Sequence, residues 1–368
     1  MILTNEPMPV AIVIVAGSSA SSALAMAELL GQVGRPRQMS ASLARENGPG
    51  IFSPYLIAEP GTAVTSPPGL RVVRLGAEQA YEQPAAVFVP DINLMPQAEQ
   101  IGQGWPAWRV WLRQCHEQGA IISSAGTGVA LLADAGLLDD QRACTHWASA
   151  QFLQAQYQRV KFDSAESFIS SDSPVKVMTA GGGQAWTDLA LQLVATLVDR
   201  DAALQLARHN MLQWREFGQR PYREPLADAS MKDAPIGRAV QWLNAHYTKA
   251  APISSAVEEA GLPERTFTRR FHLATGASPL EYVHQLRLNR ARRLLESTDL
   301  SIQVVARELG YEDPSFFSRL FKREVSLTPA QYRKRFSPLF QALPASGETA
   351  DTGGDTLTAG VAVGSGIR

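Results

Sequence analysis

Short apolar runs alternate with stretches of helical spacing over the first part of the chain. The runs with the β-branched and small apolar composition of buried strands lie at 10–17, 85–90, 120–125 and 175–181. The stretches with the period of a helix lie at 22–34, 105–119, 127–135 and 186–210. This alternation predicts a parallel sheet covered by helices on both faces, an α/β sandwich.

The pattern changes near residue 235, after which every periodic stretch is helical. Residues 213–234 carry charges and prolines without a sustained period, so we interpret them as a linker. Residues 338–368 are rich in Gly, Thr and Ala and have few large apolar side chains, which predicts a disordered tail. The chain is therefore expected to consist of an α/β domain at 8–212 and an all-α domain at 235–337.

The all-α part repeats itself. Residues 267–283 align with 317–333 at an offset of 50, and residues 253–261 align with 302–310 at an offset of 49. Each copy is a short helix, a glycine-containing turn and a second helix with a Phe-x-Arg-x-Phe core, which is the pattern of a helix-turn-helix motif. We therefore expect two such motifs in one domain.

Particular residues define each motif. Gly261 and Gly310 are expected at the positive-φ position that ends the first helix. The second helices should begin at about Pro263 or Pro314, since proline suits the first helical position. Spaced four apart on one face, the expected core residues are Phe267, Phe271, Phe317 and Phe321.

The opposite faces of the second helices carry side chains that suit DNA bases and phosphates. Arg can bridge guanine O6 and N7, hydroxyls can bond base edges or phosphates, and an aromatic edge can meet a thymine methyl. The expected DNA-reading residues are Arg265, Thr266, Thr268 and Arg269 in the first copy, with Ser315, Phe316, Ser318 and Arg319 in the second. Expected phosphate contacts, which set the register, are Lys322, Arg323, Arg333, Lys334 and Arg335. The alternative for each is a solvated helix face, and for Arg269 and Arg319 an internal ion pair.

The helix expected at 278–298 gives a geometric check. About 20 residues at about 1.5 Å each span roughly 30 Å, close to the roughly 34 Å turn of B-DNA. One chain could thus place its two reading helices in successive major grooves. Charge agrees with this interpretation, because residues 230–340 hold 17 Lys and Arg against 11 Asp and Glu, a balance of +6, whereas the rest of the chain carries −7.

This all-α part is similar to the AraC/XylS family of transcription regulators. The residues that carry the resemblance are "RLNRARRLLESTDLSIQVVARELGYEDPSFFSRLFKREVSLTPAQYR", at 287–333. One departure is Ser326, where the family usually has a glycine before the Ser/Thr-Pro pair. The resemblance implies a double-stranded DNA partner and two helix-turn-helix motifs.

Composition bounds the rest. A length of 368 residues suggests two domains, and an apolar content of 45% with a mean hydropathy of −0.10 is typical of a soluble globular protein. Because no apolar run approaches the roughly 20 residues that span a bilayer, and the N-terminus lacks a basic leader, we expect a cytoplasmic protein with no membrane partner. Cys115 and Cys144 lack metal-ligand spacing and are typical of small buried side chains.

A sharp corner from strand to helix stands at 122–138, "ISSAGTGVALLADAGLL". Such a corner often presents a nucleophile, and here its tip is Gly126. The segment "GTGVALLADAGLLDDQRACTHW" (126–147) resembles the class I glutamine-amidotransferase-like (PfpI/ThiJ) domains, which implies a flavodoxin-like, amidotransferase-like fold over about 200 residues. Residues 175–194, "VKVMTAGGGQAWTDLALQLV", continue the resemblance.

Departures from that family predict that its chemistry is lost. The family's nucleophile position falls on Gly126, which has no side chain to attack a substrate. Where relatives have Gly-Gly after the middle strand, this chain has Asp91-Ile92, and a carboxylate there would oppose an oxyanion. No acidic residue stands in the first helix entrance, "GSSASSALA". We therefore expect a sensor rather than an enzyme, with no cofactor and no metal.

The expected ligand-binding residues surround this corner: Ser18, Asp91, Asn93, Gly126, Thr127, His146 and Trp147. An acidic Asp91 with exposed amides at the helix start suits a small amine or an amino-acid-like molecule. The alternatives are structural: His146 and Trp147 fill the sheet edge, Thr127 is an N-cap, and Asp91 and Asn93 form turns.

Together the two resemblances imply a GlxA-type bacterial one-component regulator. We expect a homodimer that binds promoter DNA and a small effector and activates nearby genes, with RNA polymerase as a further candidate partner. The main rival is a thiol-dependent amidase or glyoxalase-like hydrolase with secondary DNA binding, in which Cys144 or Cys115 replaces the missing nucleophile. A third hypothesis makes the N-terminal domain a dimerisation module only.

Overall fold

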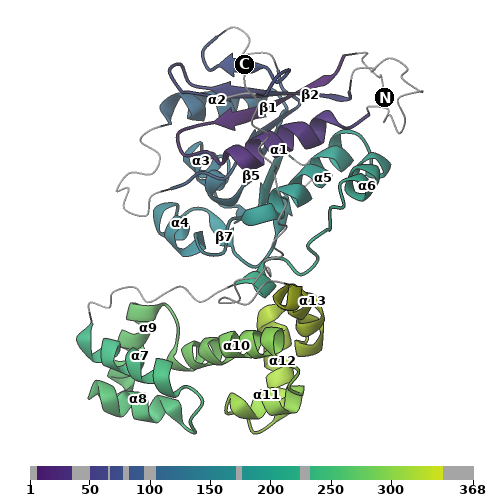
Figure 1. Cartoon of the computed structure of the whole chain (residues 1–368). Helices are drawn as coiled ribbons and strands as arrows, with labels where there is room; N and C mark the ends of the chain where they lie inside the picture. Colours follow the sequence, from purple (N-terminus) through teal and green to yellow (C-terminus); the bar gives the residue numbers. More distant parts are fainter. Residues whose placement is uncertain are drawn as a thin grey trace, which may run out of the picture. The chain divides into compact units, whose positions relative to one another are not determined.

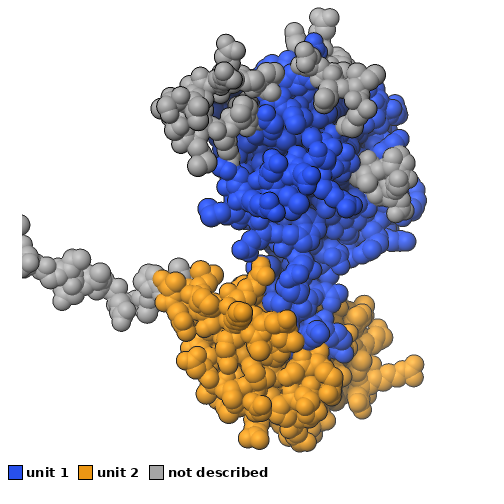
Figure 2. Space-filling model, turned by 90° about the vertical axis from the view of Figure 1, so that its right-hand side faces the viewer, with its two compact units in different colours: residues 1–231, 320–327 blue, residues 232–319, 328–368 orange. Residues whose placement is uncertain are grey.

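The computed structural model describes residues 6–34, 50–64, 67–77, 83–94, 105–170, 176–223 and 233–342. The chain divides into two compact units, residues 1–231 with 320–327 and residues 232–319 with 328–368 (Figure 2). Each unit is described by itself below.

The first unit is built on a seven-stranded sheet in the order β3-β2-β1-β4-β5-β9-β8 (Figure 1). Its strands are β1 Met8–Ile14, β2 Phe52–Ala58, β3 Val72–Arg74, β4 Ala86–Val89, β5 Ile121–Ala125, β8 Phe168–Ser170 and β9 Val177–Ala180. All neighbours are parallel except β8 and β9. The strands expected from the sequence lie at β1, β4, β5 and β9, which form one continuous part of this sheet.

Helices cover both faces of the sheet, as the alternating pattern predicts. Helices α1 Ala20–Gly31, α5 Trp186–Leu197 and α6 Arg200–His209 enclose one core, and α2 Pro106–Glu117 and α3 Val129–Asp134 enclose the other. Along β1, Val10 and Ile12 face the first core while Ala11 and Val13 face the second, because successive strand residues point to opposite faces. The expected α/β parallel-sheet sandwich is confirmed. A small second sheet pairs β6 Arg142–Cys144 with β7 Lys161–Asp163, and helix α4 Ala150–Gln156 lies between them in sequence.

The prediction of a single helix at 186–210 was wrong, because the structure divides this stretch into α5 and α6. Asp199 lies between them in an extended conformation, with φ −166° and ψ 174°, and its side chain accepts a hydrogen bond from the Ala202 N–H. An aspartate that caps the next helix competes with helix continuation at its own position. The periodicity of apolar residues persists across the break and conceals it.

The second unit contains helices only among its described residues. They are α7 Ala234–His246, α8 Pro252–Ala260, α9 Glu264–Thr275, α10 Pro279–Ser297, α11 Ile302–Glu308, α12 Pro314–Val325 and α13 Pro329–Ala342. Residues 320–325 of α12, with the two residues that follow it, group with the first unit. The expected all-α architecture is confirmed. None of the helices in the described part of the chain is long and apolar enough to cross a membrane.

Two boundary expectations need correction. Pro263 is the N-cap of α9 rather than its first helical residue, since its ψ of 139° is extended, whereas Pro314 does begin α12. The expected tail at 338–368 begins too early, because α13 continues through Pro338 to Ala342. Residues 343–368 lie outside the described residues.

Candidate functional site

The first candidate site lies at the carboxyl ends of β1, β4 and β5, where the strand order reverses. Parallel sheets bind ligands at this switch point because the connecting loops diverge there. Ser18 and Ile92 form an isolated bridge, and the Asn93 N–H donates to the Gly17 carbonyl at 2.8 Å. Ser18 is occupied locally, because its Oγ accepts from the Val15 N–H at 3.0 Å. These contacts join the loop after β1 to the loop after β4.

Gly126 stands at the tip of the corner after β5, where a short 3-10 turn, η3 Gly126–Gly128, leads into α3. Its φ is +57°, a conformation that favours glycine. A Cβ placed on Gly126 would lie 2.4 Å from Asp91 Oδ1 and 2.7 Å from Asp91 Cγ. The Asp91 carboxylate therefore occupies the space in which a side chain at position 126 would stand.

Asp91 holds the corner through Thr127. Asp91 Oδ1 accepts from the Thr127 N–H at 2.8 Å and from the Thr127 hydroxyl at 2.5 Å. The Thr127 hydroxyl also accepts from the Ile92 N–H at 3.1 Å. The N-cap interpretation of Thr127 was wrong: Gly128 caps α3 without a side-chain bond, and Thr127 instead links the helix start to the loop after β4.

His146 and Trp147 lie beside this corner, after β6. Thr145, which precedes them, donates its hydroxyl to the Gly126 carbonyl at 3.0 Å. The His146 ring packs so closely on Gly182 that a Cβ there would lie 1.6 Å from it. Burial lowers the pKa of His146, while the negative charge of Asp91 opposes that shift. His146 Nδ1 accepts from the Ala148 N–H at 3.1 Å, which leaves Nε2 as the protonated nitrogen of the neutral ring.

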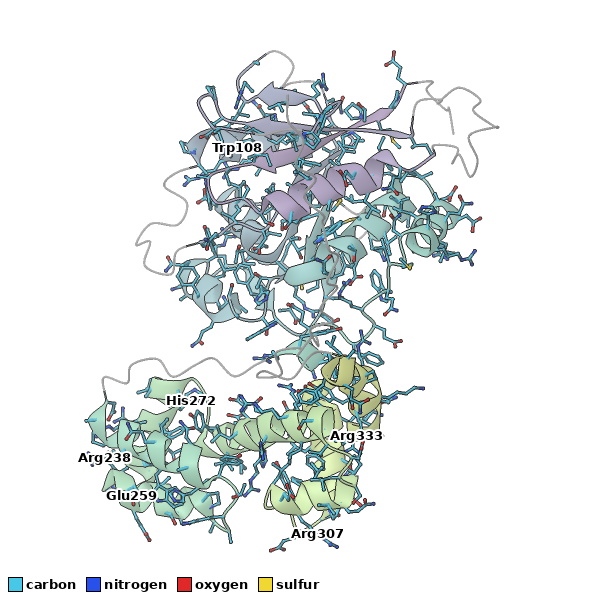
Figure 3. All side chains as sticks on the ribbon, viewed as in Figure 1. Trp108, Arg238, Glu259, His272, Arg307 and Arg333 are labelled. Carbon is cyan, nitrogen blue, oxygen red and sulfur yellow. The ribbon has the colours of Figure 1, made fainter. Side chains whose placement is uncertain are left out.

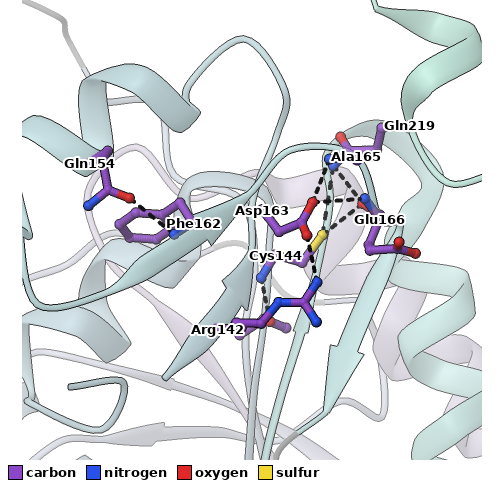
Figure 4. A network of polar contacts seen from close by, with 9 residues as sticks. Arg142, Cys144, Gln154, Phe162, Asp163, Ala165, Glu166 and Gln219 are labelled. Atoms are coloured by element: carbon purple, nitrogen blue, oxygen red, sulfur yellow. Dashed lines mark hydrogen bonds and ion pairs between the residues drawn. The ribbon is translucent and has the colours of Figure 1, made fainter. Parts of the chain in front are cut away.

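Gln219 is a residue that the sequence reasoning missed. It is 6% exposed, and its Nε2 donates to the carbonyls of Thr145 at 2.7 Å and Glu166 at 2.8 Å. Its Oε1 accepts from the Trp147 N–H at 3.2 Å and the Gly182 N–H at 3.3 Å. Figure 4 shows Gln219 with Glu166 and Cys144 in a network of polar contacts. A glutamine in a stretch of charges and prolines gives no signal of burial, so only the fold reveals that it ties residues 215–223 to the candidate site.

Neither cysteine has the environment of a nucleophile. Cys144 is fully buried and its Sγ donates to the Glu166 carbonyl at 2.9 Å; burial raises the pKa of its thiol far above the ordinary value (Figure 4). Burial likewise raises the pKa of Cys115 to about 12. Reactive cysteines have lowered pKa values and partial exposure, so both match the expected small buried side chains.

A separate cleft of about 800 Å³ lies between the ends of α1 and α6. Its lining includes Gln32, Asp199, Asp201, Gln205 and His209, and none of the ligand-binding residues expected from the sequence. It is therefore distinct from the corner at Gly126.

The second candidate site is the exposed face of α9. Phe267 and Phe271 are fully buried, their rings 5.3 Å apart. Arg265, Thr268 and Arg269 are exposed and Thr266 is half-buried. The Thr268 hydroxyl donates to the Glu264 carbonyl at 3.0 Å. Gly261, with φ +64°, ends the preceding α8 as expected.

The start of α12 presents a different set. Ser315, Phe316 and Arg319 are exposed and Ser318 is half-buried, with its hydroxyl donating to the Pro314 carbonyl at 2.9 Å. Asp313 caps the helix by accepting from the N–H groups of Ser315 and Phe316 at 2.7 and 3.1 Å.

The expected phosphate contacts differ in their availability. Lys322, Arg323, Lys334 and Arg335 are exposed. Arg333 on α13 (Figure 3) is half-buried and donates to the Leu300 carbonyl. Its guanidinium is thus already engaged within the second unit.

Comparison with known proteins agrees with this pair of glycine-ended turns and aromatic cores. Residues 256–335 match the family model described as "Helix-turn-helix domain". The chain carries an AraC-type helix-turn-helix domain. It is 27% identical to the HTH-type transcriptional regulator CdhR of Pseudomonas aeruginosa over 77% of this chain and 82% of that protein. It is also 28% identical to the HTH-type transcriptional regulator GlxA of Rhizobium meliloti, over 61% of this chain and 68% of that protein.

A solved structure also matches the AraC-type domain. It is the DNA-binding domain of the global transcriptional factor AdpA in complex with a target DNA, with a TM-score of 0.28 and 31% identity over 28% of this chain and 95% of that one.

Proposed function

We propose that the chain is a transcription activator that responds to a small metabolite bound at the corner around Gly126. DNA-binding regulation of transcription is the function that the AraC-type domain and the relatives support. The activating role, the effector and a homodimeric state are our finer proposals, as is a contact with RNA polymerase.

The observation that carries the sensor hypothesis is the position of the Asp91 carboxylate. The corner keeps the positive φ of a nucleophile elbow, yet a carboxylate fills the place of the nucleophile. A carboxylate there would repel a developing oxyanion, and it suits a cationic group instead. Among the described residues, the hydrogen bonds to the Asp91 carboxylate are accepted by Oδ1, so Oδ2 is the atom we propose for an ammonium or guanidinium group.

A thermal-shift panel tests this site. Amines and amino acids should raise the unfolding temperature of the wild-type chain, because a ligand that binds only the folded state stabilises it. Asp91→Asn keeps the shape and an oxygen for Thr127 while removing the charge, so it should abolish the shift by cationic ligands. Asp201→Asn, in the separate cleft, is the matched control. No shift across the panel, or a shift lost in Asp201→Asn rather than Asp91→Asn, contradicts the proposal.

Gel-shift experiments test the DNA-binding part. The chain should bind a fragment of its own upstream region tightly, and binding should weaken steeply with salt because phosphate contacts release counterions. Binding to no promoter fragment would refute this.

The rival function is a thiol-dependent hydrolase. The buried, high-pKa thiols of Cys144 and Cys115 weigh against it, as does the filled corner. Rapid alkylation of Cys144 with loss of a measurable turnover would support the hydrolase instead. A module that serves only for dimerisation predicts a wild-type chain that dimerises yet gives no ligand-induced shift.

A further inference from the structure

Arg287 occupies a central position in the second unit. It lies on α10, which joins the two helix-turn-helix motifs, and it is 9% exposed. Its Nε donates to the Tyr247 carbonyl at 2.8 Å, its Nη1 to the Gly310 carbonyl at 3.2 Å and its Nη2 to the Lys249 carbonyl at 3.3 Å. These three acceptors are main-chain carbonyls from two separate segments.

Those two segments belong to different motifs. Tyr247 and Lys249 lie in the connection between α7 and α8, directly before the first motif, and Gly310 is the turn of the second motif. A single guanidinium therefore forms hydrogen bonds both with the segment that precedes the first motif and with the turn of the second. Only arginine has a rigid planar fork with enough donors for three carbonyls in different directions.

The main chains of the two segments also meet directly. A Cβ on Gly310 would lie 2.3 Å from the Thr248 carbonyl oxygen and 3.1 Å from Arg287 Nη2. The φ of Gly310 is +78°, so both its conformation and its surroundings require glycine. The turn of the second motif thus rests on the loop that precedes the first.

An aromatic cluster extends the Arg287 contacts to the start of α12. The Arg287 guanidinium lies over the Tyr311 ring, 4.9 Å from its centroid, and Tyr311 packs on Phe316 with ring centroids 6.0 Å apart. His284 of α10 lies 6.4 Å from both rings. Burial raises the pKa of Tyr311 to about 12, so the ring stays neutral. Phe316, an expected DNA-reading residue, therefore packs against Tyr311, the ring that Arg287 contacts.

We propose that Arg287 is a positioning residue that fixes the separation of the two reading helices, and hence the half-site spacing that an operator must offer. Helix α10 has 19 residues and spans about 28 Å, so a small rotation about it moves the second motif far along the DNA. The three hydrogen bonds, the ring contact and the close approach at Gly310 oppose that rotation. The inference rests on the DNA-binding function and adds the residue that sets its geometry.

The experiment uses the full-length chain and a bipartite duplex selected by the wild type from random sequences. The spacing between the two half-sites is then changed by −1, +1 and +2 base pairs, and a duplex with one half-site is included. The wild type should lose about 10-fold or more in affinity for each altered spacing, the size of one mismatch.

Arg287→Met keeps the apolar stem and removes the fork. It should lose about 10-fold on the native spacing, because the linked motifs lose effective concentration, and its affinities for the four spacings should differ by less than about 3-fold. Binding to the single half-site should stay within about 2-fold of the wild type. Arg290→Met, on the same helix at an exposed position, is the matched control and should keep the wild-type spacing profile.

The outcomes separate the possible failures. If Arg287→Met binds with the wild-type spacing profile, the proposal is overturned. If Arg287→Met does not fold by circular dichroism, Arg287→Lys carries the test, since it keeps the charge and loses the fork, and the same two profiles decide. If the wild type selects no duplex, the DNA-binding function falls rather than the role of Arg287.

Discussion

The two helix-turn-helix motifs share a framework and differ on the surface. Phe267 and Phe317, 50 residues apart, are both fully buried, and the turns after α9 and α12 both place a residue at positive φ, Gly276 at +72° and Ser326 at +66°. Copies of one motif thus keep the side chains that fill a core and the backbone conformations that close a turn. Where a side chain meets solvent or a ligand, the copies are free to diverge.

The divergence is chemical and has a direction. The face of the first motif that is expected to read DNA has two exposed arginines, Arg265 and Arg269. The second has the 44% exposed Phe316 and one arginine, Arg319, which lies 3.6 Å from Asp313. We infer that the first motif contributes more charge-based contacts and the second more shape-based contact with DNA.

The largest effect tests the shared core. Phe267→Ala and Phe317→Ala should each lower the free energy of unfolding by about 3–5 kcal/mol, because each leaves a cavity in a packed site. Chemical unfolding of the full chain followed by circular dichroism measures this. Phe316→Ala, at an exposed position, should cost less than about 1 kcal/mol. Losses at Phe267 and Phe317 that differ by several kcal/mol would show that the two cores are not equivalent.

The next effect tests the difference between the reading faces. Arg265→Gln with Arg269→Gln should weaken specific DNA binding by about 1–3 kcal/mol per base contact and flatten the salt dependence. Arg319→Gln should weaken DNA binding less, because the Arg319 guanidinium is paired with the Asp313 carboxylate at the surface. Gel shifts at several salt concentrations give both quantities, with the exposed Arg293→Gln as a control. Equal losses for the two copies would contradict the comparison.

A reciprocal exchange tests the turns. Ser326→Gly should raise the free energy of unfolding by about 1 kcal/mol and Gly276→Ser should lower it by a similar amount, because a side chain at positive φ costs about that much. The positions of both residues at positive φ make this exchange symmetrical. Thermal unfolding of the two variants and of the double exchange measures it, and a stabilising Gly276→Ser would rule out the argument.

The smallest effect concerns pH. Ser278 and Glu281 form a capping box at the start of α10, and the hydrogen bonds from Ser278 lower the pKa of Glu281 below its ordinary 4.5. The corresponding pair at α13 is Thr328 and Gln331, whose amide does not titrate.

Since the folded pKa of Glu281 is lowered, its contribution to stability is complete above about pH 4.5 and is lost as the pH falls through the lowered value. The difference in the free energy of unfolding between the wild type and Glu281→Gln should therefore become smaller on acidification. Gln331→Glu should create a second dependence of the same sign. Unfolding midpoints at neutral pH and near pH 3 measure both, and a difference that does not change with pH would exclude the capping-box origin.

The fold could be predicted because its signals are local and periodic. The two motifs follow from a repeat of Phe, Gly and Pro at fixed spacing, and the sheet follows from apolar runs separated by helical stretches. The break at Asp199 and the helical state of residues 338–342 were not predicted. A capping side chain and a proline within a helix depend on neighbours that the local pattern does not contain.

The sequence by itself determined that Gly126 has no side chain and that a carboxylate follows the middle strand at Asp91. Only the tertiary structure decided that these two features are spatially connected, because the loop after β4 brings the Asp91 carboxylate into the space that Gly126 leaves empty. The same holds for Gln219 and Arg287, whose partners include main-chain carbonyls from distant segments. A carbonyl is present at every residue, so no sequence pattern marks which ones a buried side chain will meet.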